Sequence, residues 1–247
     1  MDIGYKSDKG KLRISNEDAL HVAEDSNFFV VADGVGGSNA GEVASRTAVL
    51  DFARCFADKN LESFGSESAI EEHMRQCIEK VNRRILALSH EKRENSGMAT
   101  TLVAFLIHGN RMYLINIGDS RGYICRDGRM LQITEDHTYV NGLIQAGIIS
   151  EEQAMNHKDR HMITRAVGAE ETIDADLFKV SIKQGDIIMI CTDGLYGEVS
   201  DQSMIGILSQ DKSMQEITDE LVDSANIQGG HDNITVVCVK ITEEDDI

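Results

Sequence analysis

Proline is absent from the 247-residue chain, and no low-complexity linker or internal repeat interrupts it. Its composition therefore marks no domain boundary. No apolar run approaches the roughly 18 to 20 residues that a helix needs to cross a bilayer, and the stretch 1–13 carries charges throughout. With 41% hydrophobic residues, the chain can bury a substantial core. We therefore expect a single domain over residues 1–247, without an export signal or a membrane anchor.

Closely spaced cysteines are also missing. The five cysteines are odd in number, widely spaced, and include no Cys-x-x-Cys pair; they stand at positions 55, 77, 125, 191 and 238. Most of them lie in apolar runs. This pattern favours buried thiols over disulfides or zinc ligands, and it favours a cytoplasmic location, where thiols stay reduced.

Basic residues are scarce beside acidic ones, 24 against 42, which gives a formal net charge of −18. Such a charge repels a phosphate backbone and argues against nucleic acid as a general partner. The acidic run at 243–246 is typical of a solvated tail. The chain also lacks a Gly-x-x-x-x-Gly-Lys-Ser/Thr loop, which disfavours a nucleotide-hydrolysing enzyme.

Short runs rich in Val, Ile, Phe and Tyr predict five strands, at 28–32, 101–107, 112–117, 187–191 and 234–241. Residues 108–111 supply the Gly and Asn of a hairpin loop, and 126–129 supply an Asp-Gly turn. We therefore expect antiparallel pairing.

Apolar residues at helical spacing predict helices over 44–56, 70–88 and 214–225. The last should end before the glycine pair at 229–230, as helices often do. Because runs of strands and runs of helices are segregated along the chain, we expect an α+β layered domain and not a doubly wound parallel sheet.

Aspartates recur beside the predicted strands. Asp33, Asp119 and Asp193 each follow an apolar strand next to a small turn residue, and Asp232 immediately precedes the last strand. A single Asp-Gly pair after a strand is usually only a turn. Four such positions are harder to explain by turns alone.

If these strand ends converge, the carboxylates would repel one another unless a cation neutralised them. An all-oxygen cluster without cysteine suits Mg²⁺ or Mn²⁺. Glycine after Asp33 lets the backbone approach closely, so the carbonyl of Gly34 is a further candidate ligand. Two cations about 3.5 to 4 Å apart can share a water and orient it for in-line attack on a phosphoryl group. The residues alone thus indicate a two-metal hydrolase.

The chain resembles the type 2C (PPM) family of metal-dependent serine/threonine protein phosphatases, particularly its compact bacterial single-domain members. The resemblance spans nearly the whole chain. It is carried, in order, by RISNED at 13–18, ADGVGG at 32–37, GEVAS at 41–45, GMATT at 97–101, GDSR at 118–121, TEDH at 134–137, ITRAVG at 163–168, TDGL at 192–195 and DNIT at 232–235.

The resemblance implies a four-layer αββα sandwich, in which two central antiparallel sheets are flanked by helix pairs, and Mn²⁺ or Mg²⁺ as cofactor. It implies two tightly bound cations and a weaker third. Asp33 would bridge the first two, the Gly34 carbonyl would bind one, and Asp193 with Asp232 would hold the other. The remaining roles fall to four residues: Glu17 and Asp18 would act through metal-bound water, Asp119 would share the third cation with Asp193, and Arg13 would grip the substrate phosphate by a bidentate contact.

The segment 137–165 resembles the flap that bacterial members carry beside the active site. Taken on its residues alone, it is a helical excursion in which Ser150 caps a short helix. Four residues bear on how far the resemblance extends: Val35 replaces a proposed general acid, Ser38 replaces a common histidine, His161 is expected to be an exposed surface residue, and His137 is expected to be structural.

The resemblance therefore predicts hydrolysis of phosphoserine and phosphothreonine in proteins, reversing a partner kinase in signalling. Its partners would be phosphoproteins and a cognate serine/threonine kinase, without nucleic acid or membrane. A narrower possibility is action on phosphorylated regulators of transcription. The alternative is a catalytically silent phosphoprotein-binding scaffold of the same fold, which predicts loss of metal ligands.

Overall fold

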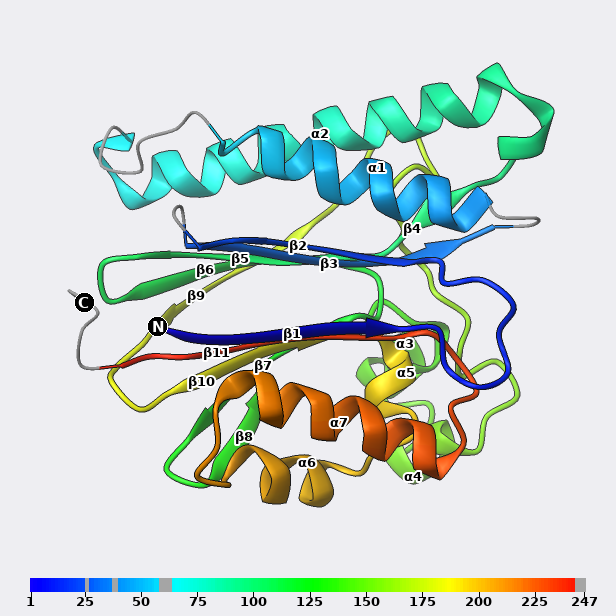
Figure 1. Cartoon of the computed structure of the whole chain (residues 1–247). Helices are drawn as coiled ribbons and strands as arrows, with labels where there is room; N and C mark the ends of the chain where they lie inside the picture. Colours follow the sequence, from blue (N-terminus) through cyan, green and yellow to red (C-terminus); the bar gives the residue numbers. More distant parts are fainter. Residues whose placement is uncertain (25–26, 37–39, 58–63, 243–247) are drawn as a thin grey trace.

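Two antiparallel sheets lie face to face between two layers of helices in the structure, a computed structural model (Figure 1). The structure describes residues 1–24, 27–36, 40–57 and 64–242. Ser38 and the acidic run at 243–246 lie outside the described residues. The layer order confirms the predicted α+β, four-layer αββα sandwich.

The first sheet brings the two ends of the chain together. Its five strands run in the order β1 (Asp2–Asp8), β11 (Ile234–Lys240), β10 (Ile187–Cys191), β7 (Arg121–Arg126) and β8 (Arg129–Gln132). All neighbours pair antiparallel. The turn between β7 and β8 places Asp127 at φ 53° and Gly128 at φ 72°, the left-handed conformation expected of an Asp-Gly hairpin turn.

The second sheet has six strands, in the order β2 (Asp18–Ala23), β3 (Phe28–Val35), β5 (Leu102–His108), β6 (Arg111–Ile117) and β9 (Asp176–Ser181), with the short β4 (Ala99–Thr100) paired to β3. All pairs are antiparallel, and β5 and β6 form the predicted hairpin, with His108 opposite Arg111.

Helices α1 (Ala40–Arg54) and α2 (Glu67–Glu91) cover the six-stranded sheet, and a short 3-10 turn η3 (Arg93–Asn95) follows α2. Helices α6 (Asp201–Leu208) and α7 (Met214–Gln228) cover the five-stranded sheet (Figure 1). A capping box formed by Ser213 and Glu216 begins α7, which ends at Gln228, before the glycine pair, as predicted.

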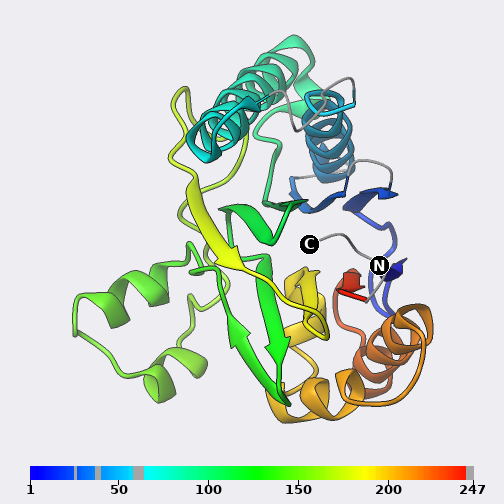
Figure 2. The same cartoon turned by 90° about the vertical axis from the view of Figure 1, so that its left-hand side faces the viewer.

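Three helices are shorter: α3 (Tyr139–Gln145), α4 (Glu151–Met155) and α5 (Asp193–Tyr196). The segment with α3 and α4 extends away from the side of the sandwich, as Figure 2 shows. Ser150 caps α4 through a capping box, as predicted. Among the helices of the described residues, none is long and apolar enough to cross a membrane.

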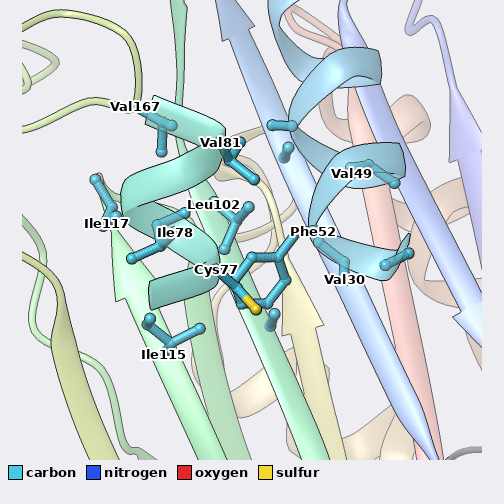
Figure 3. Close-up of a cluster of buried hydrophobic side chains, with 14 of the residues drawn as sticks. Val30, Val49, Phe52, Cys77, Ile78, Val81, Leu102, Ile115, Ile117 and Val167 are labelled. Atoms are coloured by element: carbon cyan, nitrogen blue, oxygen red, sulfur yellow. The ribbon is translucent and has the colours of Figure 1, made fainter. Parts of the chain in front are cut away.

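The core consists of three apolar layers, one between the sheets and one under each helix layer. The layer between the sheets includes Phe29, Val103, Phe105, Leu114, Ile188 and Val237. The layer beneath α6 and α7 includes Met189, Met204, Leu221 and Val236. The layer beneath α1 and α2, shown in Figure 3, includes Val30, Phe52, Ile78, Val81, Leu102 and Ile115.

The cysteines are thiols, as predicted. Four of them are buried, whereas Cys55, just beyond α1, is half-buried.

Candidate metal centre

The aspartates singled out in the sequence lie around one pocket of about 820 Å³. Asp33 comes from β3, Asp119 from the loop after β6, Asp193 from the first turn of α5, and Asp232 from the residues before β11. Glu17 and Gly34 line the same pocket. The layered fold thus brings residues from both sheets together.

Asp33 is held by backbone contacts on both sides. Its N–H donates to Thr101 Oγ1 at 2.9 Å, and its carbonyl accepts from the Thr101 N–H at 2.8 Å and from Thr100 Oγ1 at 2.8 Å. Burial raises the pKa of Asp33 well above its usual range, and the charges of the neighbouring aspartates raise it further; these are Asp18, Asp193, Asp119 and Asp232.

The other buried carboxyl groups behave in the same way. Burial raises the pKa of Asp18 to about 7 and the pKa of Asp119 to about 7, and in both groups the charge of Asp193 adds to the effect. Burial followed by the charge of Asp232 raises the pKa of Asp193. Because these carboxyl groups share one small volume, the neutral form of each is favoured over the charged form.

Two carboxylate oxygens in this cluster are buried without compensation. Asp18 Oδ2 accepts from Thr192 Oγ1 at 3.0 Å and from Thr235 Oγ1 at 2.7 Å, but Asp18 Oδ1 has no hydrogen-bond partner among the described residues. Asp193 Oδ1 is also buried and has no hydrogen-bond partner among the described residues. A buried carboxylate oxygen without a partner is costly, and a cation would compensate it. The residues therefore fit a divalent cation with oxygen ligands.

The carboxylates lie in one pocket, but their side chains do not form a complete set of metal ligands among the described residues. Among the described residues, no three His, Cys, Asp or Glu side chains converge as metal ligands. One reason is that Asp232 is already engaged: its Oδ2 lies 2.6 Å from Arg13 Nη2, and its Oδ1 accepts from the Asn233 N–H at 2.8 Å. A cation must compete with Arg13 for this carboxylate.

Gly34 and Glu17 are fixed by close backbone packing against α1. The Gly34 N–H donates to the Glu17 carbonyl at 3.1 Å, and Ser45 Oγ of α1 donates to the same carbonyl at 2.5 Å. A Cβ added at Gly34 would meet the Gly41 carbonyl oxygen at 2.1 Å, so this position requires glycine. Burial raises the pKa of Glu17.

The rim of the pocket carries cationic and apolar side chains. Arg13 is 55% exposed, and Val35, also in the rim, is 44% exposed. Arg160 and His161 reach the rim from the segment after α4. His161 is exposed, as expected, but it also lies near enough to Asp193 that its charge lowers the pKa of that carboxyl.

His137 is buried and fully engaged at the base of the segment 137–165. Its Nδ1 accepts from the Gly118 N–H at 3.1 Å, and its Nε2 lies 3.1 Å from Asp176 Oδ2. Its hydrogen bonds agree with the structural role expected from the sequence.

Several supporting residues were not singled out in the sequence. Asn233 Oδ1 accepts from the Glu17 N–H at 2.8 Å, while its side-chain amide donates to the carbonyls of Lys9 and Ser15 at 2.9 Å. Asn233 and Thr101 stand inside quoted motifs, so the motifs held a signal for them. The pair formed by His231 Nδ1 and Glu198 Oε1, 2.6 Å apart on the pocket wall, had no such signal.

Comparison with known proteins matches this chain to well-defined relatives. A family model for protein phosphatase 2C matches residues 11–234. The serine/threonine phosphatase stp of Listeria welshimeri is 37% identical over 245 residues, which are 97% of this chain and 96% of that protein. The serine/threonine protein phosphatase PstP of Mycobacterium tuberculosis is 36% identical over 240 residues, which are 97% of this chain but 45% of PstP.

Solved structures agree with these sequence relatives. The S. agalactiae serine/threonine phosphatase superposes with a TM-score of 0.91 at 32% identity, covering 97% of this chain and 99% of that one. The PstP catalytic domain in complex with two manganese ions superposes with a TM-score of 0.86 at 34% identity, covering 98% of each chain. The chain is therefore a protein serine/threonine phosphatase that belongs to the protein phosphatase 2C family.

Proposed function

We propose that this phosphatase hydrolyses phosphoserine and phosphothreonine in proteins with two tightly held Mn²⁺ or Mg²⁺ ions and a weaker third. The observation that carries the proposal is the cluster of buried carboxyl groups with raised pKa values and uncompensated oxygens in one pocket. Bound divalent cations supply a nucleophilic water at neutral pH and neutralise developing charge on phosphate oxygens.

The positions of these residues in the pocket support the ligand assignment that the family resemblance implies. Asp33 lies among the charges of Asp18, Asp119, Asp193 and Asp232, which suits a ligand shared by two cations. The Gly34 carbonyl would be a further ligand of one cation, and Asp193 with Asp232 would hold the other. Asp119 interacts most strongly with Asp193 among the charged groups, which supports a third site shared by those two.

Glu17 and Asp18 are assigned to the outer part of the site, where they act through water. Asp18 is held by two threonine hydroxyls, and Glu17 is anchored by its backbone to Asn233. These contacts hold both residues in fixed positions, which supports a role as outer-shell groups.

Arg13 is assigned to the substrate phosphate. Its guanidinium lines the pocket and contacts Asp232 Oδ2, which supports a position beside the reacting phosphate. If Asp232 held a cation, the Arg13 guanidinium would be free to bind a phosphate through two hydrogen bonds.

Residues 1–247 are proposed to act as one catalytic domain, with residues 137–165 as a flap. Both ends of this segment meet, because Thr138 bridges to Ile163 and the Tyr139 N–H donates to the Met162 carbonyl at 2.8 Å. Its helices line a second pocket of about 740 Å³ that shares Asp119 and Asp193 with the first. This shared lining supports a role for the flap in contacting a substrate protein beside the reacting phosphate.

The wider setting is proposed to be cytoplasmic signalling in which the enzyme reverses a serine/threonine kinase. The thiol state of the cysteines supports a reducing compartment, and the charge of −18 disfavours nucleic acid or an anionic membrane as partner. The silent-scaffold alternative requires loss of the carboxylates, whereas all of them lie in the pocket or directly behind it.

The test is metal dependence on a phosphothreonine peptide. Activity should require Mn²⁺ or Mg²⁺ and disappear with a chelator. Asp193→Asn should lower kcat by more than about 100-fold and weaken Mn²⁺ binding in calorimetry, since even outer-shell partners are worth about 10- to 100-fold. Asp211→Asn, the same change at an exposed position, is the control. Full turnover in chelated enzyme, or an active Asp193→Asn variant with unchanged Mn²⁺ affinity, would refute the proposal.

A further inference from the structure

Two cysteines meet at the far end of the helix pair that covers the six-stranded sheet. Cys55 lies one residue beyond the end of α1, and Cys77 lies within α2. Both lie against the ring of His73, and an interaction with the Cys77 side chain lowers the pKa of the Cys55 thiol. Figure 3 shows Cys77 with its sulfur between α1 and α2, beside Phe52. The end of α1 and the middle of α2 thus place two cysteines around one imidazole.

A histidine ties the two cysteines together. His73 Nε2 lies 3.0 Å from the carbonyl oxygen of Cys55 and 3.5 Å from Sγ of Cys77. The imidazole is itself wedged between aromatic rings, with centroids 5.0 Å from Phe56 and 5.1 Å from Phe64. These contacts hold the end of α1 and the adjoining turn of α2 in a fixed relation.

The two thiols differ in access. Cys77 is buried, whereas Cys55 is half-buried and its Sγ also lies 3.4 Å from the carbonyl oxygen of Asp51. A small oxidant can therefore reach Cys55 first, while Cys77 is protected from solvent and stands next to it.

The surroundings also favour the thiolate of Cys55. The hydrogen bond from Cys77 lowers the pKa of Cys55 to about 7, with Lys80 acting in the same direction and burial and Asp51 opposing it. Burial has the opposite result at the remaining cysteines, where it raises the pKa of Cys125, Cys191 and Cys238. Thiolate character and access together mark reactive cysteines.

We propose that Cys55 and Cys77 are a peroxide-reactive dithiol that closes into a disulfide joining α1 to α2. The Cys55 thiolate attacks one oxygen of hydrogen peroxide, breaks the O–O bond and becomes a sulfenic acid, and the departing hydroxide takes up a proton to form water. The sulfur of Cys77 then attacks Cys55 Sγ and displaces hydroxide, which leaves as water with the Cys77 proton. Two thiols are oxidised and one peroxide is reduced to two waters.

This inference does not depend on the proposed function, because neither cysteine lines the metal pocket. It does concern the same helix, however: the first turns of α1 carry Gly41 and Ser45, which contact Gly34 and Glu17 at the other end. The disulfide would link the C-terminal end of α1 covalently to α2.

The experiment treats the whole metal-loaded protein with hydrogen peroxide and maps its peptides by mass spectrometry without reduction. We expect a Cys55–Cys77 linked peptide, lighter by two hydrogen atoms than the sum of the two reduced peptides and lost on adding dithiothreitol. Cys77→Ser should instead leave a sulfenic acid at Cys55 that dimedone traps. Cys125→Ser, at a buried cysteine outside the cluster, is the control and should form the link as the wild type does.

Cys55→Ser covers the case in which the buried Cys77→Ser variant fails to fold, because Cys55 is half-buried. It should abolish the linked peptide and leave Cys77 unoxidised under the same treatment. The proposal is overturned if the wild type forms only sulfinic acid at Cys55, links Cys55 to another cysteine, or forms only dimers between two chains.

Discussion

At the residue scale, Arg13 carries two roles that compete. In the structure it pairs with Asp232, and in the proposed reaction it binds the substrate phosphate. Both partners are anionic oxygens, so one guanidinium serves either, depending on whether a cation has taken Asp232. This exchange makes Arg13 a sensitive probe of the site.

Arg13→Ala should lower kcat/KM on a phosphothreonine peptide by about 10- to 150-fold, because a charge-assisted hydrogen bond contributes about 1.5 to 3 kcal/mol. Mn²⁺ affinity should not fall, because the variant removes a competitor for Asp232. Steady-state kinetics and calorimetry measure the two effects separately.

Lysine at the same position is the matched variant. Arg13→Lys keeps the charge but not the planar two-point contact, so it should recover only part of the lost kcat/KM. An Arg13→Ala enzyme with unaltered kcat/KM would remove Arg13 from the site.

At the element scale, the contact between β3 and the start of α1 depends on glycine. Gly34→Ala should destabilise the protein by several kcal/mol, because its Cβ would lie 2.1 Å from the Gly41 carbonyl oxygen and backbone would have to move. Gly206→Ala is the control: it lies within α6, nothing approaches its Cβ within 4 Å, and it should be stabilising by about 1 kcal/mol. Urea unfolding compares the two, and similar midpoints would contradict the packing argument.

The base of the flap depends on His137. His137→Ala removes the acceptor of the buried Gly118 N–H and the contact with Asp176, and an unsatisfied buried group costs about 1 to 3 kcal/mol. Since Gly118 precedes Asp119, activity should fall along with stability.

His108→Ala, a half-buried histidine at the end of β5, is the control for the flap prediction and should be close to neutral. Thermal unfolding and peptide hydrolysis provide the two measurements. A His137→Ala variant with wild-type stability would show that the flap base is held by other contacts.

At the scale of the whole molecule, the acidic cluster couples stability to pH and to metal. Asp18 and Asp119 have pKa values of about 7 when folded, against about 3.9 when unfolded. Between these values the folded state holds more protons than the unfolded state, so the free energy of unfolding falls as pH rises through that window. The contribution of these two carboxyl groups to the free energy of unfolding is fully present below about pH 4 and lost above about pH 7.

Chelated protein should therefore melt at a lower temperature at about pH 8 than at about pH 6, and added Mn²⁺ should raise the melting temperature more at the higher pH. Mn²⁺ replaces protons as the neutralising charge, and it binds better where fewer protons compete. Asp18→Asn should flatten the pH dependence of the chelated protein. A Mn²⁺ effect that is the same at both pH values would contradict the assignment of the cluster.

The sequence by itself determined the elements whose patterns are local. Buried strands such as β5 and β10 are continuous apolar runs, and the Asp-Gly turn at 127–128 has a conformation that few other pairs adopt. Half-exposed strands such as β1 and β9 were not predicted, because their alternating polar residues resemble a loop. The strand-end aspartates and their motifs could also be recognised, because each motif is a short run of adjacent residues.

Only the tertiary structure decided which groups share one small volume. The pairing of β1 with β11 places the segment after β1 beside Asp232, so Arg13 meets a residue more than two hundred positions away. Burial of Asp18 between Thr192 and Thr235, and the position of Cys55 and Cys77 around His73, likewise depend on packing between distant segments. The pKa of a carboxyl or thiol group depends on its burial and on the groups around it in space, and the residues adjacent in the sequence determine neither.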